Sequence, residues 1–357
     1  MRDNNKSEFL KNLLITPSPT GFEAKGQQIW MDYVGQFADE IEADSYGSAY
    51  GRVNVDTDAI TVMLEAHCDE IGMMINYIDD NGFIYVTRLG GSDPSITRAK
   101  KINIHTKEGI VTGVIGNTAI HLQDKEQKSK TPSWSDIFID IGVSNKEEAL
   151  KLVQVGDPIT YAEDFEYLND EIIAGRALDN RIGGYIIART LEELSNQKAD
   201  LKVNVLALNS VQEEIGGFGA RMMSYRLMPD IALVTDVTHA TDSPGINLKE
   251  HGLVTLGGGP TITHGSANHP LIVKKIEAVA KEKNITIQHE ATSNRTGTDT
   301  DSIFYQQTGI SSALISMPLR YMHSPVEMVS MKDVDQLINL MTQTVLSLKK
   351  GEQFRVI

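Results

Sequence analysis

Side chains that could bind a metal ion follow several apolar segments of this sequence. Histidine nitrogens and carboxylate oxygens are the donors that zinc-class ions use when no thiolate is present. Each position taken alone has an ordinary structural explanation, because a single histidine or aspartate is usually a packing or helix-capping residue. Taken together, they predict that one edge of the fold binds cations. These residues are His67, Asp69, Asp179, Glu213, Glu214, Asp236 and His323.

The adjacent pair Glu213–Glu214 is the strongest single signal. A pair of glutamates is normally solvated, but this one follows the apolar run 203–211 and precedes Gly216–Gly217, where a surface ion-pair pattern is not expected. Two adjacent carboxylates repel each other, and burying both is costly unless cations neutralise them. The pair therefore indicates that cations bind nearby.

The number of donors suits two divalent ions. Two sites need about three protein ligands each, with one carboxylate shared between them and a water left over. Cys68 is the only cysteine in the chain. Because no thiolate cluster selects the metal, Zn, Co and Mn are all compatible. If Asp179 bridges the ions, the predicted ligands are His67, Asp179, Glu214, Asp236 and His323.

Two further carboxylates remain for other roles. Glu213 is the predicted general base, which takes a proton from a water activated by the two ions. Asp69 lies two residues after His67, on the same side of an extended segment. There it can accept the ring N–H and orient the imidazole. We therefore expect Glu213 and Asp69 to be the catalytic residues besides the ligands.

An alternation of strands and helices is predicted to bring these side chains together. The runs 60–67, 203–211, 231–237 and 311–317 have the composition of buried strands, and amphipathic helices lie between the later ones. This order predicts an α/β fold with a mixed, largely parallel sheet flanked by helices. Ligands of such sheets bind beyond the carboxyl ends of the strands, where the candidate residues lie. The predicted helices are 181–194, 218–227, 269–284, 299–307 and 332–350.

The N-terminal segment 6–37 is predicted to form two helices. The Pro-rich stretch 16–23 separates them. Within it, Thr20 and Glu23 have the spacing of a capping box for the second helix.

The segment 72–162 is predicted to be a separate, mostly β module. Asn81–Gly82 and Glu108–Gly109 each separate two short runs rich in β-branched and aromatic residues, which indicates β-hairpins. We therefore expect one domain formed by 1–71 and 163–357, with a small β-barrel-like domain inserted at 72–162.

Charge and composition exclude several classes of protein. The 357 residues include 33 Lys and Arg against 48 Asp and Glu, a formal charge of −15, which opposes binding to nucleic acid. No run approaches the about 18 apolar residues of a membrane span, and the N-terminus lacks a secretory signal. We therefore expect a cytoplasmic protein without membrane contact. A single cysteine forbids an internal disulfide.

The candidate residues lie in an ordered series of motifs that resembles the tetrahedral (TET) aminopeptidases, a family that includes glutamyl and deblocking aminopeptidases. The resemblance covers nearly the whole chain, and the series is more specific than any single motif. The motifs are EAHCDEIG (65–72), GRALDNRIGG (175–184), VQEEIGGFGA (211–220), VTDVTHATDSPG (234–245), GTDTDS (297–302) and PLRYMHSPVEMV (318–329).

This resemblance implies a metal-dependent aminopeptidase with a zinc-exopeptidase fold and two divalent ions in each subunit. It implies that Glu213 is the catalytic base and that Asp69 supports a ligand. The implied ligands are His67 and Asp236 for one ion, Glu214 and His323 for the other, and Asp179 for both.

The resemblance also implies a role for the inserted domain in dimerisation. Family members assemble dimers into a hollow tetrahedral dodecamer that admits short peptides, which are the implied substrates. This sequence has Phe218 where relatives often carry a basic residue, and Ala119 lies where a proline is common. The preferred N-terminal residue, the native metal, and the choice between dimer and dodecamer stay open.

Two alternative functions fit parts of the pattern. An endoglucanase-like glycoside hydrolase would use Glu213 and a second carboxylate as acid and nucleophile. It would leave His67 and His323 without a role, and the chain has only 6% aromatic residues. A metal-dependent deacylase or carboxypeptidase on the same scaffold is the second alternative.

A few other polar residues near the motifs have ordinary or open interpretations. His239 and Arg320 follow predicted strands, and either could contact substrate. Asp299 is expected to cap a helix. The remaining histidines, including His264 and His289, are expected to be structural or surface residues.

Overall fold

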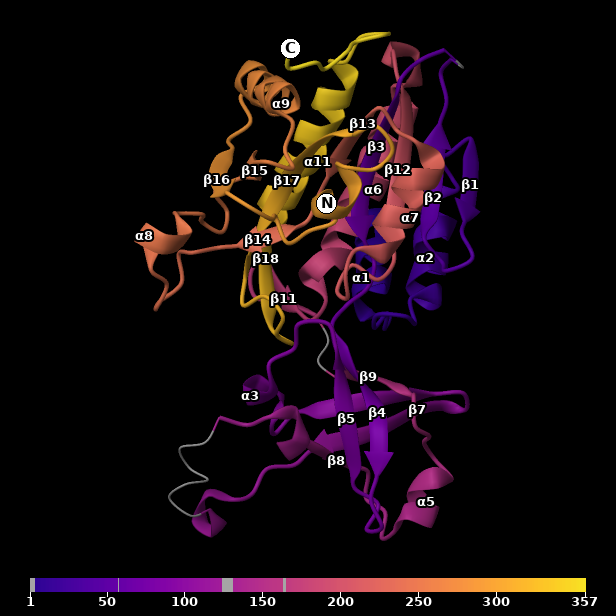
Figure 1. The fold of residues 1–357 in the computed structure, drawn as a ribbon, viewed down its shortest axis with the longest axis vertical. Coiled ribbons are helices and arrows are strands. Elements are labelled where there is room, and N and C mark those ends of the chain that lie inside the picture. The colour runs from indigo at the N-terminus through magenta and orange to yellow at the C-terminus, as the bar shows by residue number, and fades with distance from the viewer. Residues whose placement is uncertain (1–3, 57, 124–130, 163–164) are drawn as a thin grey trace.

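The computed structural model describes residues 4–56, 58–123, 131–162 and 165–357. They form two parts, which Figure 1 shows one above the other. The larger part contains a 12-stranded sheet, and the smaller part is a closed barrel. No helix among these residues is long and apolar enough to cross a membrane.

A mixed sheet forms the centre of the larger part. Its strands are β1 (Glu40–Ala43), β2 (Ala49–Val53), β3 (Thr61–His67), β10 (Glu166–Tyr167), β11 (Ile172–Gly175), β12 (Asn204–Ser210), β13 (Ile231–Val234), β14 (Val237–His239), β15 (Thr261–Gly265), β16 (Gln288–Thr292), β17 (Ser311–Arg320) and β18 (Glu327–Ser330). The main order is β1-β2-β12-β3-β13-β17-β18-β11-β10. The central strands β12, β3, β13 and β17 are parallel neighbours, whereas β2 and β18 pair antiparallel with them. The predicted fold class is confirmed.

Helices cover both faces of this sheet. Successive residues of β3 face opposite sides. Leu64 packs in a core cluster with residues of the helices α6 and α11. Met63 packs in a second cluster with residues of the helices α7 and α10. The helices of the larger part are α1 (Asn4–Ile15), α2 (Ala24–Val34), α6 (Leu178–Asn196), α7 (Phe218–Leu227), α8 (Leu248–His251), α9 (Pro270–Lys283), α10 (Thr300–Ile303) and α11 (Met331–Leu346).

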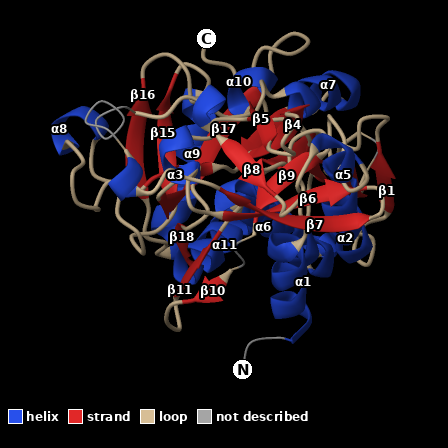
Figure 2. Ribbon diagram, turned by 90° about the horizontal axis from the view of Figure 1, so that it is seen from below, coloured by secondary structure: helices blue, strands red, loops and turns tan. Residues whose placement is uncertain are grey.

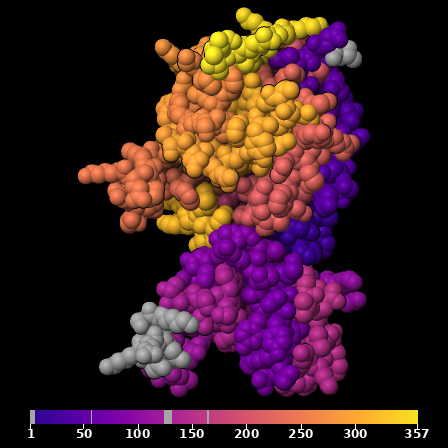
Figure 3. All heavy atoms as spheres, in the orientation of Figure 1, coloured from indigo at the N-terminus to yellow at the C-terminus, as the bar shows by residue number. Residues whose placement is uncertain are grey.

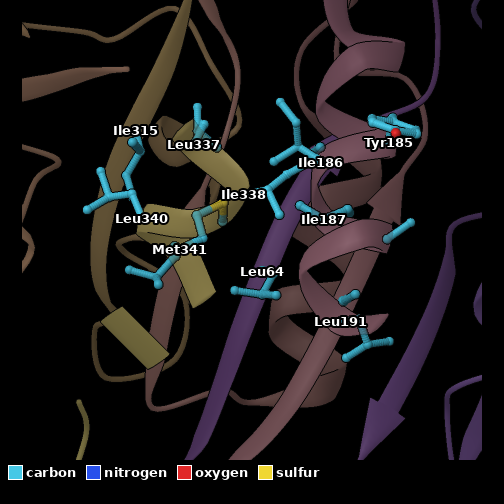
Figure 4. Packing of buried hydrophobic residues seen from close by; sticks show 14 of the residues in the cluster. Leu64, Tyr185, Ile186, Ile187, Leu191, Ile315, Leu337, Ile338, Leu340 and Met341 are labelled. Carbon is cyan, nitrogen blue, oxygen red and sulfur yellow. The ribbon is translucent and has the colours of Figure 1, made fainter. Parts of the chain in front are cut away.

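The larger core is a close packing of aliphatic side chains from neighbouring elements. Figure 4 shows Leu64 of β3, Ile186 of α6 and Leu337 of α11 within it. All three side chains are fully buried. Burying such a side chain contributes about 1.5–3 kcal/mol to folding. This packing fixes the strands whose ends carry the candidate residues.

The inserted part is a closed antiparallel barrel with the strand order β4-β5-β8-β7-β6-β9. The predicted hairpins are confirmed, because β4 pairs with β5 across Asn81–Gly82 and β6 pairs with β7 across Glu108–Gly109. The elements are β4 (Gly72–Ile78), β5 (Ile84–Leu89), α3 (Pro94–Thr97), β6 (Lys101–Thr106), β7 (Gly109–Ile115), β8 (Phe138–Asp140), α5 (Lys146–Leu150) and β9 (Pro158–Tyr161).

The barrel has its own apolar core, separate from the clusters around the large sheet. Met73, Ile104 and Ile139 are fully buried in it. Seen from below in Figure 2, the strands of the barrel lie in front of the helices of the larger part. In the space-filling view of Figure 3, the barrel forms a distinct lower lobe. The predicted boundary after residue 162 falls at 163–164, outside the described residues.

The capping box predicted for the second helix is wrong. Glu23 precedes α2, but its side chain makes no cap hydrogen bond and instead accepts one from the Gly21 N–H. Thr20 Oγ1 donates to Asp69 Oδ2, 2.8 Å away. The hydroxyl of Thr20 therefore bonds to a residue far away in the sequence instead of capping the helix.

Candidate metal centre

Parallel strands bring the candidate residues to one edge of the sheet. In the registers of β3 with its two neighbours, Ser210 of β12 lies opposite His67, and Val234 of β13 lies opposite Glu65. The three strands therefore end close together, and the residues that follow them share the same edge. This is the carboxyl-end crevice where α/β sheets bind ligands.

The five predicted ligands come together there in two adjoining groups. Within each group, one donor atom from every residue lies within 4.8 Å of the others. Asp179 belongs to both. The groups are His67, Asp179 and Asp236, and then Asp179, Glu214 and His323.

The carboxylate of Asp179 lies between the two histidines. Its Oδ1 is 3.3 Å from His67 Nε2, and its Oδ2 is 3.3 Å from His323 Nε2. His67 Nε2 is also 3.6 Å from Asp236 Oδ1, and His323 Nε2 is 3.4 Å from Glu214 Oε2. Each imidazole thus faces one separate carboxylate and the shared one.

Glu327 holds two of these residues by their backbones. Its Oε2 accepts the N–H of Asp179, and its Oε1 accepts the N–H of His323. His323 has a φ of +59°, which is uncommon for a residue with a side chain and is typical of functional sites. The sequence motifs did not single out Glu327 as a residue of the site. The available signal was a carboxylate in the apolar run EMVS, which forms the buried strand β18.

Asp69 connects His67 to the glutamate pair. Its Oδ1 is 3.3 Å from His67 Nδ1 and accepts the N–H of Glu213 at 2.9 Å. Its Oδ2 accepts the N–H of Glu214 at 3.2 Å. The ring nitrogen also lies 3.2 Å from the Asp69 carbonyl oxygen. Asp69 can therefore orient both the imidazole and the loop that carries the two glutamates.

Glu213 lies beside the two groups without belonging to either. Its Oε2 is 3.9 Å from His67 Nε2, and its side chain is 16% exposed. It lines a cavity of about 360 Å³ together with the residues of both groups. Burial raises the pKa of Glu213 to about 10, and the neighbouring charges of Asp299 and Asp236 act in the same direction. A strongly perturbed carboxyl group in a cavity is typical of functional sites.

Imidazoles and carboxylates are strongly paired in this cluster. Burial by itself lowers the pKa of His323, but Asp179 and Glu214 raise it to about 11. Burial also opposes protonation of His67, yet Asp236 and Asp179 hold its pKa well above the ordinary value. The pKa of Asp179 is lowered, because hydrogen bonds from both histidines outweigh the raising effect of its burial.

This donor set fits divalent cations. Carboxylates and imidazoles line the same cavity, and no Lys or Arg is among the described residues of its lining. Glu214 Oε1 is buried and has no hydrogen-bond partner among the described residues. A buried carboxylate oxygen without a partner is costly, and a cation would satisfy it.

A second pair of carboxyl groups lies beneath this cluster. Glu65 and Asp299 are both buried, and Ser210 Oγ is 2.8 Å from an oxygen of each. The prediction that Asp299 caps a helix is therefore wrong: it precedes α10, but its side chain makes no cap hydrogen bond. Burial raises the pKa of Asp299 to about 6.

The other candidates divide between the cavity and the surface. His239 lines the cavity with the metal-centre residues. Arg320 is held by Asp242 through two hydrogen bonds, of 2.8 and 2.7 Å. His264 and His289 are surface residues as predicted, although with Glu277 they form a third group of possible metal donors.

Comparisons with known proteins identify the family. A family model described as M42 glutamyl aminopeptidase matches residues 47–340. The lysyl aminopeptidase of Pyrococcus furiosus is 34% identical over 337 residues, which cover 93% of this chain and 94% of that protein.

Two solved structures share the whole fold. The TET aminopeptidase of a marine sediment archaeon of the Thaumarchaeota has a TM-score of 0.92 and 29% identity, and the match covers 97% of each chain. The TET1 peptidase of Pyrococcus horikoshii, which can assemble into a tetrahedron or a large octahedral shell, has a TM-score of 0.84 and 28% identity. That match covers 96% of this chain and 100% of the other. The chain therefore belongs to the M42 glutamyl aminopeptidase family of peptide hydrolases.

Proposed function

We propose that this protein is a dinuclear metal aminopeptidase that releases N-terminal residues from short peptides. The observation that carries the proposal is the sharing of Asp179 between two groups of metal donors, with Glu213 beside them and in neither. His67 and Asp236 would hold one ion, Glu214 and His323 the other, and Asp179 both.

The residues of the chain divide the chemistry among them. When bound, divalent ions would supply Lewis acidity toward water and the scissile carbonyl, and would offset the charge of the carboxylates. Glu213 accepts a proton from the attacking water and passes it to the leaving amine. The side chain of Glu213 lines the cavity beside both groups of donors, where it can hold the proton between the two steps. Asp69 keeps the His67 ring in place.

We propose that the inserted segment 72–162 mediates contacts between subunits. Its barrel exposes apolar side chains on β7, where Ile110 is 60% and Val114 45% exposed. The two residues are four positions apart on β7 and therefore face the same side of the strand, and apolar side chains exposed on one face are typical of protein interfaces. The assembly of the TET1 peptidase into closed shells supports dimers that build a tetrahedral dodecamer.

The variant Glu213→Gln tests the proposed base. It should lower kcat on an unblocked aminoacyl-coumarin by about 10²–10⁴-fold, the usual contribution of a general base. Metal content, measured by plasma mass spectrometry, should stay at that of the wild type. Glu282→Gln, at an exposed residue of α9, is the matched control and should change neither quantity. Loss of metal from Glu213→Gln would make this residue a ligand and contradict the proposal.

A further inference from the structure

A second and larger cavity opens beside the candidate metal centre. It measures about 800 Å³, against about 360 Å³ for the cavity that contains the proposed ligands. Thr238, His239 and Met322 line both. A peptide whose N-terminal residue lies at the metal centre can therefore extend its first side chain into the larger cavity.

The carboxylate of Glu290 lies in the wall of this larger cavity. Thr238 Oγ1 donates to its Oε2, Thr263 Oγ1 donates to its Oε1, and Ser316 Oγ lies 3.4 Å from Oε1. A carboxylate has about four lone-pair sites, so these three hydroxyls leave room for another donor. Thr238, which donates to Glu290, lies two residues after Asp236 and also lines the cavity of the metal centre.

The charges and shape of the cavity favour a long cationic side chain. Glu250 and Glu290 are its acidic groups, and its described lining contains no Lys or Arg. Val237, Val254 and Leu319 supply apolar wall, against which methylene groups can pack. A positive group at the end of such a stem would meet the carboxylate that the three hydroxyls hold in place.

We propose that this cavity binds the side chain of the N-terminal residue and selects lysine and arginine through Glu290. The inference rests on the proposed aminopeptidase function and names its substrate class. A hydrogen bond between charged partners in a partly enclosed site is stronger than one between neutral groups. An acidic N-terminal side chain would instead be repelled by two carboxylates.

Turnover of matched substrates is the first test. Lysyl-coumarin and norleucyl-coumarin share the same stem, except that lysine carries the terminal ammonium. The wild type should have a kcat/KM at least about tenfold higher for the lysyl substrate. Glu290→Gln keeps the size of the side chain and should remove most of this preference. It should leave the norleucyl rate within about threefold of the wild type.

Glu277→Gln is the matched control for this variant. Glu277 lies on α9 within 4 Å of His264 and His289 and is absent from the lining of the cavity. This variant should keep the lysyl preference. Equal rates for the two substrates in the wild type, or an equal fall for both in Glu290→Gln, would overturn the proposal.

Binding separates a failure of this proposal from a failure of the proposed function. Calorimetry of the metal-loaded protein with lysinamide and norleucinamide needs no turnover. Lysinamide should bind at least about tenfold more tightly, and Glu290→Gln should abolish the difference. Equal affinities would overturn the selection of cations even in an active enzyme. Inactivity on every unblocked substrate, together with tighter lysinamide binding, would contradict the peptidase function and leave the pocket assignment intact.

Discussion

The barrel and the large sheet place their strand ends differently. All six barrel strands pair antiparallel, so neighbouring carboxyl ends point to opposite rims. In the sheet, β12, β3, β13 and β17 run parallel, so their carboxyl ends share one edge. No residue of the barrel strands belongs to the groups of metal donors found among the described residues. A site that needs donors from several strands is favoured by the parallel arrangement.

We expect the largest difference between the two regions when one buried aspartate in each is replaced by asparagine. Asp179→Asn at the sheet edge removes a charge shared by both donor groups. It should lower metal content below one ion per chain and reduce kcat by more than about 10³-fold. Plasma mass spectrometry and coumarin release measure the two quantities.

Asp157→Asn in the barrel is the matched control. Asp157 is also buried, at 5% exposure, but its Oδ2 accepts the local N–H of Gln154. Metal content and activity should therefore stay at wild-type values. Two ions retained by Asp179→Asn would remove the bridging role, and metal lost from Asp157→Asn would remove the contrast between the regions.

A substitution at the junction of the two regions should change the free energy of unfolding. Glu70 lies between β3 and β4 and pairs with Arg176 and Arg181. All three residues are buried. Glu70→Gln leaves two buried guanidinium groups without their partner and should lower the free energy of unfolding by about 3–5 kcal/mol. Urea unfolding of the wild type and the variant gives this difference.

The same pair predicts a dependence on pH. Burial raises the pKa of Glu70, but the two guanidinium charges outweigh it and hold the pKa below 4.5. The ion pair therefore stabilises the protein fully above pH 4.5 and loses its effect as pH falls through the lowered pKa. The difference between wild type and Glu70→Gln should be constant near neutrality and shrink in acid. A difference that grows in acid would contradict this assignment.

The smallest expected effect on the fold tests the proposed role of the barrel. Ile110→Ser removes an exposed apolar side chain from β7 and should change the free energy of unfolding by less than about 0.5 kcal/mol. It should nevertheless weaken contact between subunits, which light scattering would detect as a lower mass at equal concentration. Metal content serves as the control. An unchanged mass would place the interface elsewhere.

Sequence patterns predict most of the local structure and the residues gathered at the sheet edge. The expected helix 218–227 coincides with α7, and the two expected hairpins are present in the barrel. His67 and Asp236 can be placed because parallel strands bring their carboxyl ends together, whatever the details of packing.

Sequence patterns do not predict contacts that depend on the pairing of strands far apart in the chain. Glu290 meets Thr263 because β15 and β16 pair in parallel, and the pattern predicts neither β15 nor this pairing. Glu327 reaches Asp179 because β18 pairs with β11, where Glu327 lies opposite Gly175. Thr20 has a local capping signal, yet its hydroxyl donates to Asp69 across the fold. Local propensity is a weak signal when a buried carboxylate competes for the same donor.

The turn after β5 brings backbone of the barrel segment against the metal centre. Gly90 and Gly91 follow β5, and a β-carbon on them would lie 2.9 Å from Glu214 Oε2 and 2.5 Å from His323 Nδ1. The backbone of the barrel thus forms part of the wall behind two proposed ligands. A side chain at either position would press on one of these ligands, so the proposed site also depends on a segment that contributes none of the donors found among the described residues.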